Sequence, residues 1–277
     1  MDLPRYDLHC HSTASDGTLT PTELLQRAEQ KGIKVLALTD HDTIQGAIEL
    51  TRSSQYKVKL ISGAELTCAW NGRVIHIVGL GFDLESADMS DYLQNIAQLR
   101  VERARKITLQ LMQLGLPDLY DEAKNLSDGG SIGRPHFAKA MVKLGLVASE
   151  QQAFKKYLAV GKKGDVKMQW PDISDTVDVI KQAGGFSVIA HPTKYKMTFT
   201  KLRAVVADFV QCGGDGLEVS YPGVTPDQHY HLLRIADQYN LLTSAGSDFH
   251  SPAQGWAELG KYPPLKSVKN HILSHLL

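Results

Sequence analysis

The stretch "YDLHCHSTASDG", residues 6–17, decides how the rest of the chain is interpreted. It opens the first hydrophobic segment and places His9, His11 and Asp16 within eight positions. Residues i and i+2 of a strand point to the same face, so His9 and His11 can reach one ion while Cys10 points away. The geometry is that of a chelate, but an HxH pair alone is a weak metal signal because a strand also carries two histidines by chance.

Short apolar runs rich in β-branched residues alternate with helical patterns along the chain. The stretch "TPTELLQRAEQKG" (20–32) predicts a helix with Thr20 as N-cap, Pro21 in the first turn, Glu23 completing a capping box and Gly32 after its end. This rhythm predicts an α/β fold of parallel strands with crossover helices. The predicted strands are 34–39, 58–66, 74–81, 186–191, 216–220 and 241–248.

The segment 88–170 interrupts this rhythm. It contains three helical patterns, at 90–115, 117–126 and 134–145, and no strand signal. Strands resume after it in the same style, so the sequence predicts one α/β domain, residues 1–87 and 171–277, that carries a helical, substrate-binding insertion at 88–170.

Composition limits the classes of function. With 277 residues, of which 43% are hydrophobic and 22% charged, the chain can bury a large core. Thirty basic residues balance thirty acidic ones, so no global positive field is available to hold long nucleic acid. Cys10, Cys68 and Cys212 form no CxxC pair, which favours a reducing cytosol, and neither a leader segment nor a membrane span is predicted.

Further candidate metal ligands lie in or at the ends of the predicted strands, and six of the eleven histidines belong to these motifs. Taken singly, each residue has an ordinary explanation, such as a hydrogen-bonded core histidine, a turn aspartate or a helix N-cap. Taken together, nine such groups need cations to be buried side by side. They are His9, His11, Asp16, His41, Glu65, His76, His191, Asp248 and His250.

The ordered motifs "DLHCHS", "TDHD", "GAE", "IHIVG", "AHP" and "SDFH" resemble the polymerase and histidinol phosphatase (PHP) superfamily, from Tyr6 to about Gly260. Within it, "IGRPHFAKAMV" (132–142) and "FKKYLAVGKKG" (154–164) resemble the branch of nucleoside 3′,5′-bisphosphate phosphatases and 5′ to 3′ exoribonucleases. The resemblance implies a distorted seven-stranded barrel with three divalent ions, most often manganese, with iron or zinc as alternatives.

The resemblance also implies how the ligands are shared among the ions. Glu65 would bridge two ions, and Asp40 and Asp42 would orient histidine ligands, with helix capping as the alternative for both aspartates. The first ion would lie on His9, His11, Glu65 and Asp248, the second on Asp16, His41 and His250, and the third on Glu65, His76 and His191.

Clustered divalent ions suit phosphate ester hydrolysis, because they lower the pKa of water and neutralise phosphoryl oxygens. The chain contains no Walker phosphate loop, and the predicted nucleophile is a metal-activated hydroxide attacking in line with the departing ribose oxygen. In this hypothesis His191 and His250 act as ligands rather than as free bases.

Four basic or polar residues are predicted to contact substrate. Arg134, at the start of a helix, suits a phosphate oxygen, and His136 follows it on the same helix. Lys156 belongs to a lysine cluster that a solvated helix face explains equally well, and Arg100, Arg103, Arg105 and Lys106 are predicted to be solvated surface. Lys194 in "HPTKY" and Asp165 replace an arginine and an aromatic of the branch, which leaves the preferred substrate open.

Three functions compete at this stage. The first is removal of the 3′-phosphate from nucleoside 3′,5′-bisphosphates, or stepwise 5′ to 3′ trimming of short RNA ends. The second is a histidinol-phosphatase-like small phosphomonoesterase, against which the insertion motifs argue. The third is a metal-stabilised binding module of a larger nucleic-acid enzyme. The predicted partners are nucleotides or short RNA ends, with no obligate protein partner.

Overall fold

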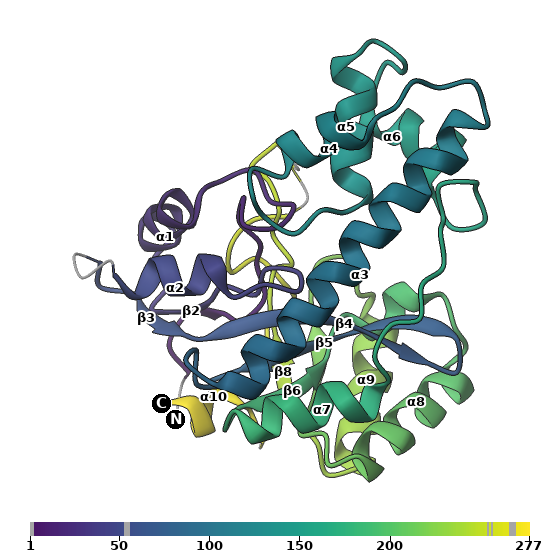
Figure 1. Cartoon of the computed structure of the whole chain (residues 1–277). Coiled ribbons are helices and arrows are strands. Elements are labelled where there is room, and N and C mark those ends of the chain that lie inside the picture. Colours follow the sequence, from purple (N-terminus) through teal and green to yellow (C-terminus); the bar gives the residue numbers. More distant parts are fainter. Residues whose placement is uncertain (1–2, 53–55, 254, 256, 266–269) are drawn as a thin grey trace.

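The computed structural model describes residues 3–52, 56–253, 255, 257–265 and 270–277 (Figure 1). Within these ranges the chain forms eight strands in two sheets, surrounded by helices. The strands are β1 (Tyr6–Asp7), β2 (Val35–Ala37), β3 (Lys59–Ile61), β4 (Gly63–Trp70), β5 (Arg73–Leu80), β6 (Phe186–Ile189), β7 (Gly216–Ser220) and β8 (Leu242–Ala245). The helices are α1 (Pro21–Gln30), α2 (Gln45–Thr51), α3 (Ala87–Met112), α4 (Tyr120–Leu126), α5 (Arg134–Lys143), α6 (Glu150–Ala153), the π-helix η1 (Phe154–Leu158), α7 (Ile173–Gln182), the 3₁₀ helix η2 (Pro192–Tyr195), α8 (Phe199–Gln211), α9 (Pro226–Gln238) and α10 (Leu273–Leu276).

The sheets confirm the predicted α/β class but not the seven-stranded barrel. Strands β1, β2 and β3 form a parallel sheet, and β4 to β8 form a second sheet in chain order, with β6, β7 and β8 parallel. The two sheets meet through isolated bridges, Cys10 with Phe249 and His41 with Glu65. Among the described residues no continuous ladder closes the two sheets into a ring.

The hairpin of β4 and β5 corrects the prediction of parallel strands. The two strands pair antiparallel over their full length, from Gly63 opposite Leu80 to Trp70 opposite Arg73. Asn71 and Gly72 make the turn with φ of 47° and 71°, the left-handed geometry for which Asn-Gly is the preferred pair. The dipeptide is a local hairpin signal, and the pairing brings the candidate ligands of the two strands onto one face of the sheet.

Helix α1 confirms the predicted capping signals. The Thr20 hydroxyl accepts a hydrogen bond from the Glu23 amide at 3.2 Å, and the Glu23 carboxylate accepts one from the Thr20 amide at 2.8 Å. Pro21 is the first helical residue, and Gly32 takes φ of 72° after the last turn. Local sequence therefore determines both ends of this helix.

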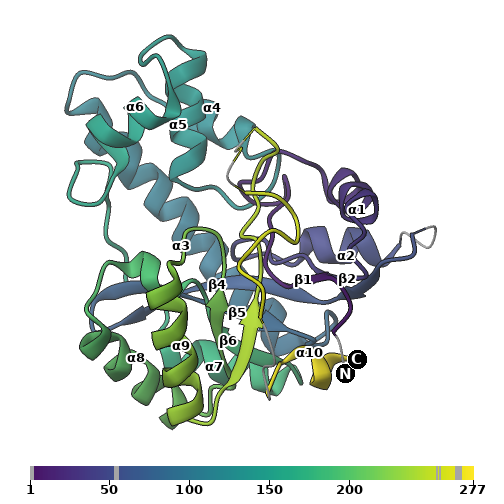
Figure 2. The same ribbon diagram turned by 180° about the vertical axis from the view of Figure 1, so that it is seen from behind.

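Helices α7, α8 and α9 cover the five-stranded sheet and build the main core with it (Figure 2). Helix α3 begins in this core, where it buries Met89 and Leu93, and then leads away from the sheets to α4, α5 and α6 (Figure 1). Its second half buries Ile107 and Leu111 in a separate apolar cluster with these helices. A single helix thus packs in both cores, and none of the described helices is long and apolar enough to cross a membrane.

Candidate metal centre

The nine predicted ligand residues converge in one place at the ends of the strands. Glu65 and His76 lie within β4 and β5, and the other seven lie in the segments that follow β1, β2, β6 and β8. Cys10 points away from its histidine neighbours into an apolar cluster, where its thiol donates to Ala37 O at 3.3 Å, as the alternation along a strand predicts. Residues far apart in sequence meet because strand ends gather at one edge of the fold.

Glu65 is the centre of the cluster, and its side chain is fully buried. Its Oε2 atom lies 3.3 Å from Nε2 of both His9 and His11 and 3.1 Å from Nδ1 of His41. Its Oε1 atom lies 2.8 Å from His76 Nδ1 and 2.7 Å from His191 Nε2. One carboxylate therefore faces five imidazoles, which is the arrangement expected of a group that bridges cations.

Two aspartates complete the cluster on the side of His11. Asp248 Oδ1 lies 3.2 Å from His11 Nε2 and 3.6 Å from His9 Nε2. Asp16 Oδ1 lies 3.2 Å from His250 Nε2, and its Oδ2 lies 3.9 Å from His41 Nε2. Every predicted ligand thus has another within contact distance.

Unpaired buried atoms in the cluster fit a metal site. Buried nitrogen and oxygen atoms normally have hydrogen-bond partners, so orphans need an explanation. Several ligand atoms here are buried without one, although they lie close to each other, and a divalent cation would satisfy them together because imidazole and carboxylate suit Mn, Fe and Zn. These atoms are His9 Nε2, both ring nitrogens of His11, Asp16 Oδ1, His41 Nδ1 and Glu65 Oε2.

The ligand atoms form three groups, each of which fits one ion. His9, His11, Glu65 and Asp248 form the first group, which coincides with the predicted first set. The second group is Asp16, His41 and His250 with His11 added. The third is His41, Glu65 and His76, whereas the predicted third set has His191, whose Nε2 contacts Glu65 Oε1. The assignment of each residue to an ion stays a prediction.

The protonation of the cluster follows from its burial and charges. Burial disfavours the charged imidazolium of His11, but contacts with Asp248 and Glu65 outweigh it and raise the pKa of His11 to about 10. Burial also disfavours the charged form of Asp16, which would raise its pKa. The nearby imidazole of His250 outweighs this effect and holds the pKa of Asp16 well below its usual value. Without a cation, protonated His11 thus lies beside these carboxylates, so a cation that binds His11 must displace its proton. Burial lowers the pKa of His41 to about 3, which leaves that imidazole neutral.

Three residues of the centre have strained backbones. Asp42, His191 and Asp248 have φ of 52°, 27° and 47°, a region that costs a non-glycine residue about 1–3 kcal/mol. A hydrogen bond holds each amide: Asp42 N donates to Glu65 O at 3.0 Å, and Asp248 N donates to His9 O at 2.8 Å. His191 N donates to Glu218 Oε2 at 2.6 Å. The surrounding structure thus imposes these conformations and with them the direction of the ligands.

Glu218, which the sequence analysis does not assign to any role, supports two of the candidate ligands. Besides the His191 amide it contacts His9 Nδ1, 3.1 Å from its Oε1, and it is almost completely buried in β7. A carboxylate on the far ring nitrogen orients a histidine ligand and raises its basicity. A lone charged residue inside the apolar run "GLEVS" is the signal that could have revealed it.

Glu218→Gln is expected to weaken metal binding by about 10–100-fold, the usual effect of losing such a supporting contact. The amide keeps the volume but only one acceptor oxygen, so either the His9 ring or the His191 amide loses its partner. Calorimetric titration of the chelator-treated protein with Mn²⁺ measures the effect. Glu49→Gln, on the exposed face of α2, is the control, and equal affinities of the two variants would contradict the prediction.

Asp40 and Asp42 do not cap helix α2, whose N-cap is Ile44 without a side-chain hydrogen bond. Asp40 instead accepts hydrogen bonds from the Ser12 amide at 2.7 Å and from the Ser15 hydroxyl at 2.6 Å. It thereby holds the loop between His11 and Asp16. The helix-capping alternative is wrong for both residues.

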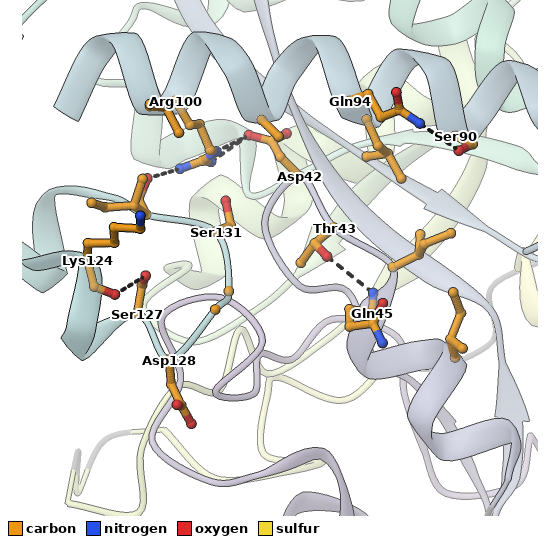
Figure 3. A pocket seen from close by; sticks show the side chains of 18 of the residues that line it. Asp42, Thr43, Gln45, Ser90, Gln94, Arg100, Lys124, Ser127, Asp128 and Ser131 are labelled. Carbon is orange, nitrogen blue, oxygen red and sulfur yellow. Dashed lines mark hydrogen bonds and ion pairs between the residues drawn. The ribbon is translucent and has the colours of Figure 1, made fainter. Parts of the chain in front are cut away.

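Asp42 pairs with Arg100 of α3, so the prediction that Arg100 is solvated surface is wrong (Figure 3). The Arg100 side chain is 11% exposed, and its Nε lies 2.6 Å from Asp42 Oδ2. It also donates to Thr67 Oγ1 and to Ile132 O, both at 3.2 Å. Arg103 is likewise part-buried and donates to Val166 O at 3.0 Å. Arg100 therefore ties the strand of Glu65, the segment after His41 and the loop before α5 together.

The predicted substrate residues lie in different surroundings. Lys194 reaches the centre, because its Nζ forms an ion pair with Asp248 Oδ2. His136 is buried at the start of α5, where its Nδ1 accepts from Gly133 N at 3.0 Å and where burial, partly offset by Asp16, lowers its pKa to about 4. Lys156 lies exposed on η1.

Arg134 is engaged with residues 158–165, which lie in the predicted insertion. Its Nη1 donates to Leu158 O at 3.0 Å and to Asp165 Oδ1 at 3.1 Å, and Asp165 also accepts from Gly161 N. Asp165, which stands where the related branch has an aromatic residue, therefore supplies the negative charge that pairs with Arg134. A phosphate would have to compete with this ion pair for the guanidinium.

The chain is similar to known proteins in sequence and in fold. The PHP domain family matches residues 7–160, more than half of the chain. The chain therefore belongs to the PHP domain family.

Individual relatives extend the likeness over nearly the whole chain. A 5′-3′ exoribonuclease of Haemophilus influenzae is 48% identical over 258 residues, 93% of each chain. A 3′,5′-nucleoside bisphosphate phosphatase of Chromobacterium violaceum is 38% identical, with 99% of this chain and 97% of the relative covered. The solved structure of an amidohydrolase from C. violaceum, with bound sulfate and no metal, superposes with a TM-score of 0.91 at 36% identity, covering 98% of this chain and 95% of the other. The protein is a hydrolase of the phosphoesterase class.

Proposed function

We propose that this protein removes the 3′-phosphate of nucleoside 3′,5′-bisphosphates and trims short RNA from the 5′ end to 5′-mononucleotides. The observation that carries the proposal is the cluster that Glu65 forms with six histidines and two aspartates, in a chain similar to proteins named for these two activities. Both activities need the same bond cleavage, so one centre serves both.

The common step is hydrolysis of a P–O3′ bond. Water adds its oxygen to phosphorus, the bond from phosphorus to the ribose O3′ breaks, and O3′ takes up a proton. With a bisphosphate the products are inorganic phosphate and a nucleoside 5′-monophosphate. With RNA the first nucleotide leaves as a 5′-monophosphate, and the phosphorus stays as the new 5′-phosphate of the shortened chain.

The cluster would hold up to three divalent ions, and manganese is the proposed metal. Such ions, when bound, acidify water and neutralise the charge on the phosphoryl oxygens. The protein itself keeps His9 and His191 oriented through Glu218 and holds the ligand loop of Asp16 through Asp40. These contacts pre-arrange the ligands before substrate arrives, which favours catalysis since little reorganisation is left for the reaction.

Substrate binding is assigned to Lys194 and to the insertion 88–170, with His136 at the start of α5 next to the loop of Asp16. Lys194 is the best placed of the four predicted contacts, because its ammonium group already lies against Asp248. Arg134 and Lys156 would contact the more distant phosphate. Balanced overall charge favours small substrates and short RNA ends over long duplexes. The three cysteines are free, in keeping with the proposed cytosolic setting.

The test is hydrolysis of adenosine 3′,5′-bisphosphate, a 5′-phosphorylated trinucleotide and histidinol phosphate, each with Mn²⁺ and after chelation. We expect phosphate and AMP from the first substrate, 5′-mononucleotides from the second, and loss of both reactions on chelation. Turnover of histidinol phosphate alone would replace the proposal with a small phosphomonoesterase. Absence of turnover with Mn, Fe and Zn would favour a binding module.

A further inference from the structure

A cavity of about 890 Å³ is lined on one side by the Asp42–Arg100 pair (Figure 3). The start of α2, the segment 84–86, the first half of α3, helix α4 and the loop 127–132 line it. Its volume is in the range of small-molecule sites. Neither the predicted ligands nor the predicted substrate residues line this cavity.

Two short segments of the chain, at Asp42 and at Ser131, lie between the cavity and the candidate ligands. Asp42, which lines the cavity, directly follows His41, and its amide donates to Glu65 O at 3.0 Å. Ser131 lines the cavity on another side, and its amide donates to Ala14 O at 3.1 Å, in the loop between His11 and Asp16. A molecule in the cavity therefore lies next to the segments that carry the candidate ligands His41, Glu65 and Asp16.

The lining suits an uncharged, flat group better than a phosphate. Asp42 neutralises Arg100, and the lining contains the two acids Glu85 and Asp128 besides Lys124, so no net positive charge is left for an anion. Apolar side chains of α2 and α3, among them Ile48, Leu93 and Ala97, offer surface to a ring.

Polar groups in the cavity match the edges of a nucleoside. Gln45, Gln94 and Asn125 carry amides that can both donate to and accept from base edges. The Ser131 hydroxyl is buried without a hydrogen-bond partner, and Figure 3 shows it directed toward α3. The three amides therefore offer donors and acceptors to a polar ligand.

We propose that this cavity binds the base and ribose of the second nucleotide of an RNA substrate. The inference rests on the proposed function, in which the phosphorus under attack is linked to that nucleotide through O5′. A nucleoside 3′,5′-bisphosphate has no second nucleotide, so it leaves the cavity empty. The cavity thus distinguishes RNA from mononucleotide at a single reaction centre.

Ala97→Trp tests the proposal, because Ala97 is exposed on α3 and an indole there fills the cavity without disturbing a core. Asn95→Trp, on the same helix but outside the lining, is the matched control. For a 5′-phosphorylated trinucleotide, the KM of Ala97→Trp should rise roughly tenfold or more, the size of effect expected when one base loses its binding surface. The kcat/KM for adenosine 3′,5′-bisphosphate should stay within about twofold of wild type.

Equal losses on both substrates, or no loss on either, would overturn the proposal. An unchanged Asn95→Trp and a thermal midpoint of Ala97→Trp close to wild type exclude a general effect of the added tryptophan. The outcome is separate from a failure of the proposed function, which would appear as absent turnover of the bisphosphate by the wild-type protein.

Discussion

Glu65→Gln reduces kcat for adenosine 3′,5′-bisphosphate by at least about 10²–10³-fold, the range seen when one fixed electrostatic stabiliser is removed from a reaction centre. Glu65 is fully buried and faces five imidazoles, so no neighbouring carboxylate can take its position. Glutamine keeps the volume and removes the negative charge that would bridge two cations. The loss therefore reports on charge and not on packing.

The measurement is turnover with saturating Mn²⁺, together with the metal content of the purified variant by mass spectrometry. His41→Ala should show a loss of similar order, because His41 Nδ1 lies 3.1 Å from Glu65 Oε2. Glu49→Gln should retain wild-type turnover, since Glu49 is exposed on α2. Near-wild-type rates of Glu65→Gln and His41→Ala in metal-replete buffer would contradict the proposed role of the cluster.

Arg100→Met lowers the free energy of unfolding by about 3–5 kcal/mol, the typical result of removing one partner of a buried ion pair. Asp42 would keep its charge and its hydrogen bond from the Thr67 amide, 2.6 Å away, but would lose its cation. The variant also frees Ile132 O, so the loop before α5 loses its link to the strand of Glu65. A fall in kcat/KM should therefore accompany the loss of stability.

Urea unfolding at one fixed Mn²⁺ concentration measures the change. Arg105→Met is the control, because Arg105 is exposed on the same helix and only lies over the Tyr120 ring at 5.7 Å. Asp42→Asn combined with Arg100→Met should recover part of the stability, since the pair is then removed as a unit. If Arg100→Met costs no more stability than Arg105→Met, the Asp42–Arg100 pair is not a structural link.

The departures at Lys194 and Asp165 both affect how substrate phosphate is held. Lys194 keeps a positive charge at the rim of the centre, in contact with Asp248, but as a point charge it lacks the planar fork of arginine. Asp165 holds Arg134 through a contact 3.1 Å long. Lys194 is therefore expected to bind phosphate more weakly than an arginine at its position would. Arg134, paired with Asp165, is expected to bind it more weakly than an unpaired guanidinium would.

Local signals in the sequence were sufficient for much of this protein. The ends of α1 follow from Thr20, Pro21 and Glu23, because a capping box is a contact between residues three positions apart. The opposite directions of Cys10 and its neighbouring histidines follow from the pleat of a strand. The Asn71–Gly72 turn is equally local, and the antiparallel hairpin could have been predicted from it.

The ligand set as a whole follows from the order of the motifs, since strand ends in such folds meet at one edge. The sequence by itself therefore determined the α/β class, the candidate ligands and the family, because each depends on short-range patterns or on ordered motifs. Only the tertiary structure decided that Glu218 supports His9, that Arg134 is paired with Asp165, and that Arg100 is buried against Asp42, 58 positions away. The physical reason is that local sequence periodicity predicts a charged side chain on a helix to be solvated whenever its partner is unknown. The partners of these side chains come from distant segments, which no local periodicity connects.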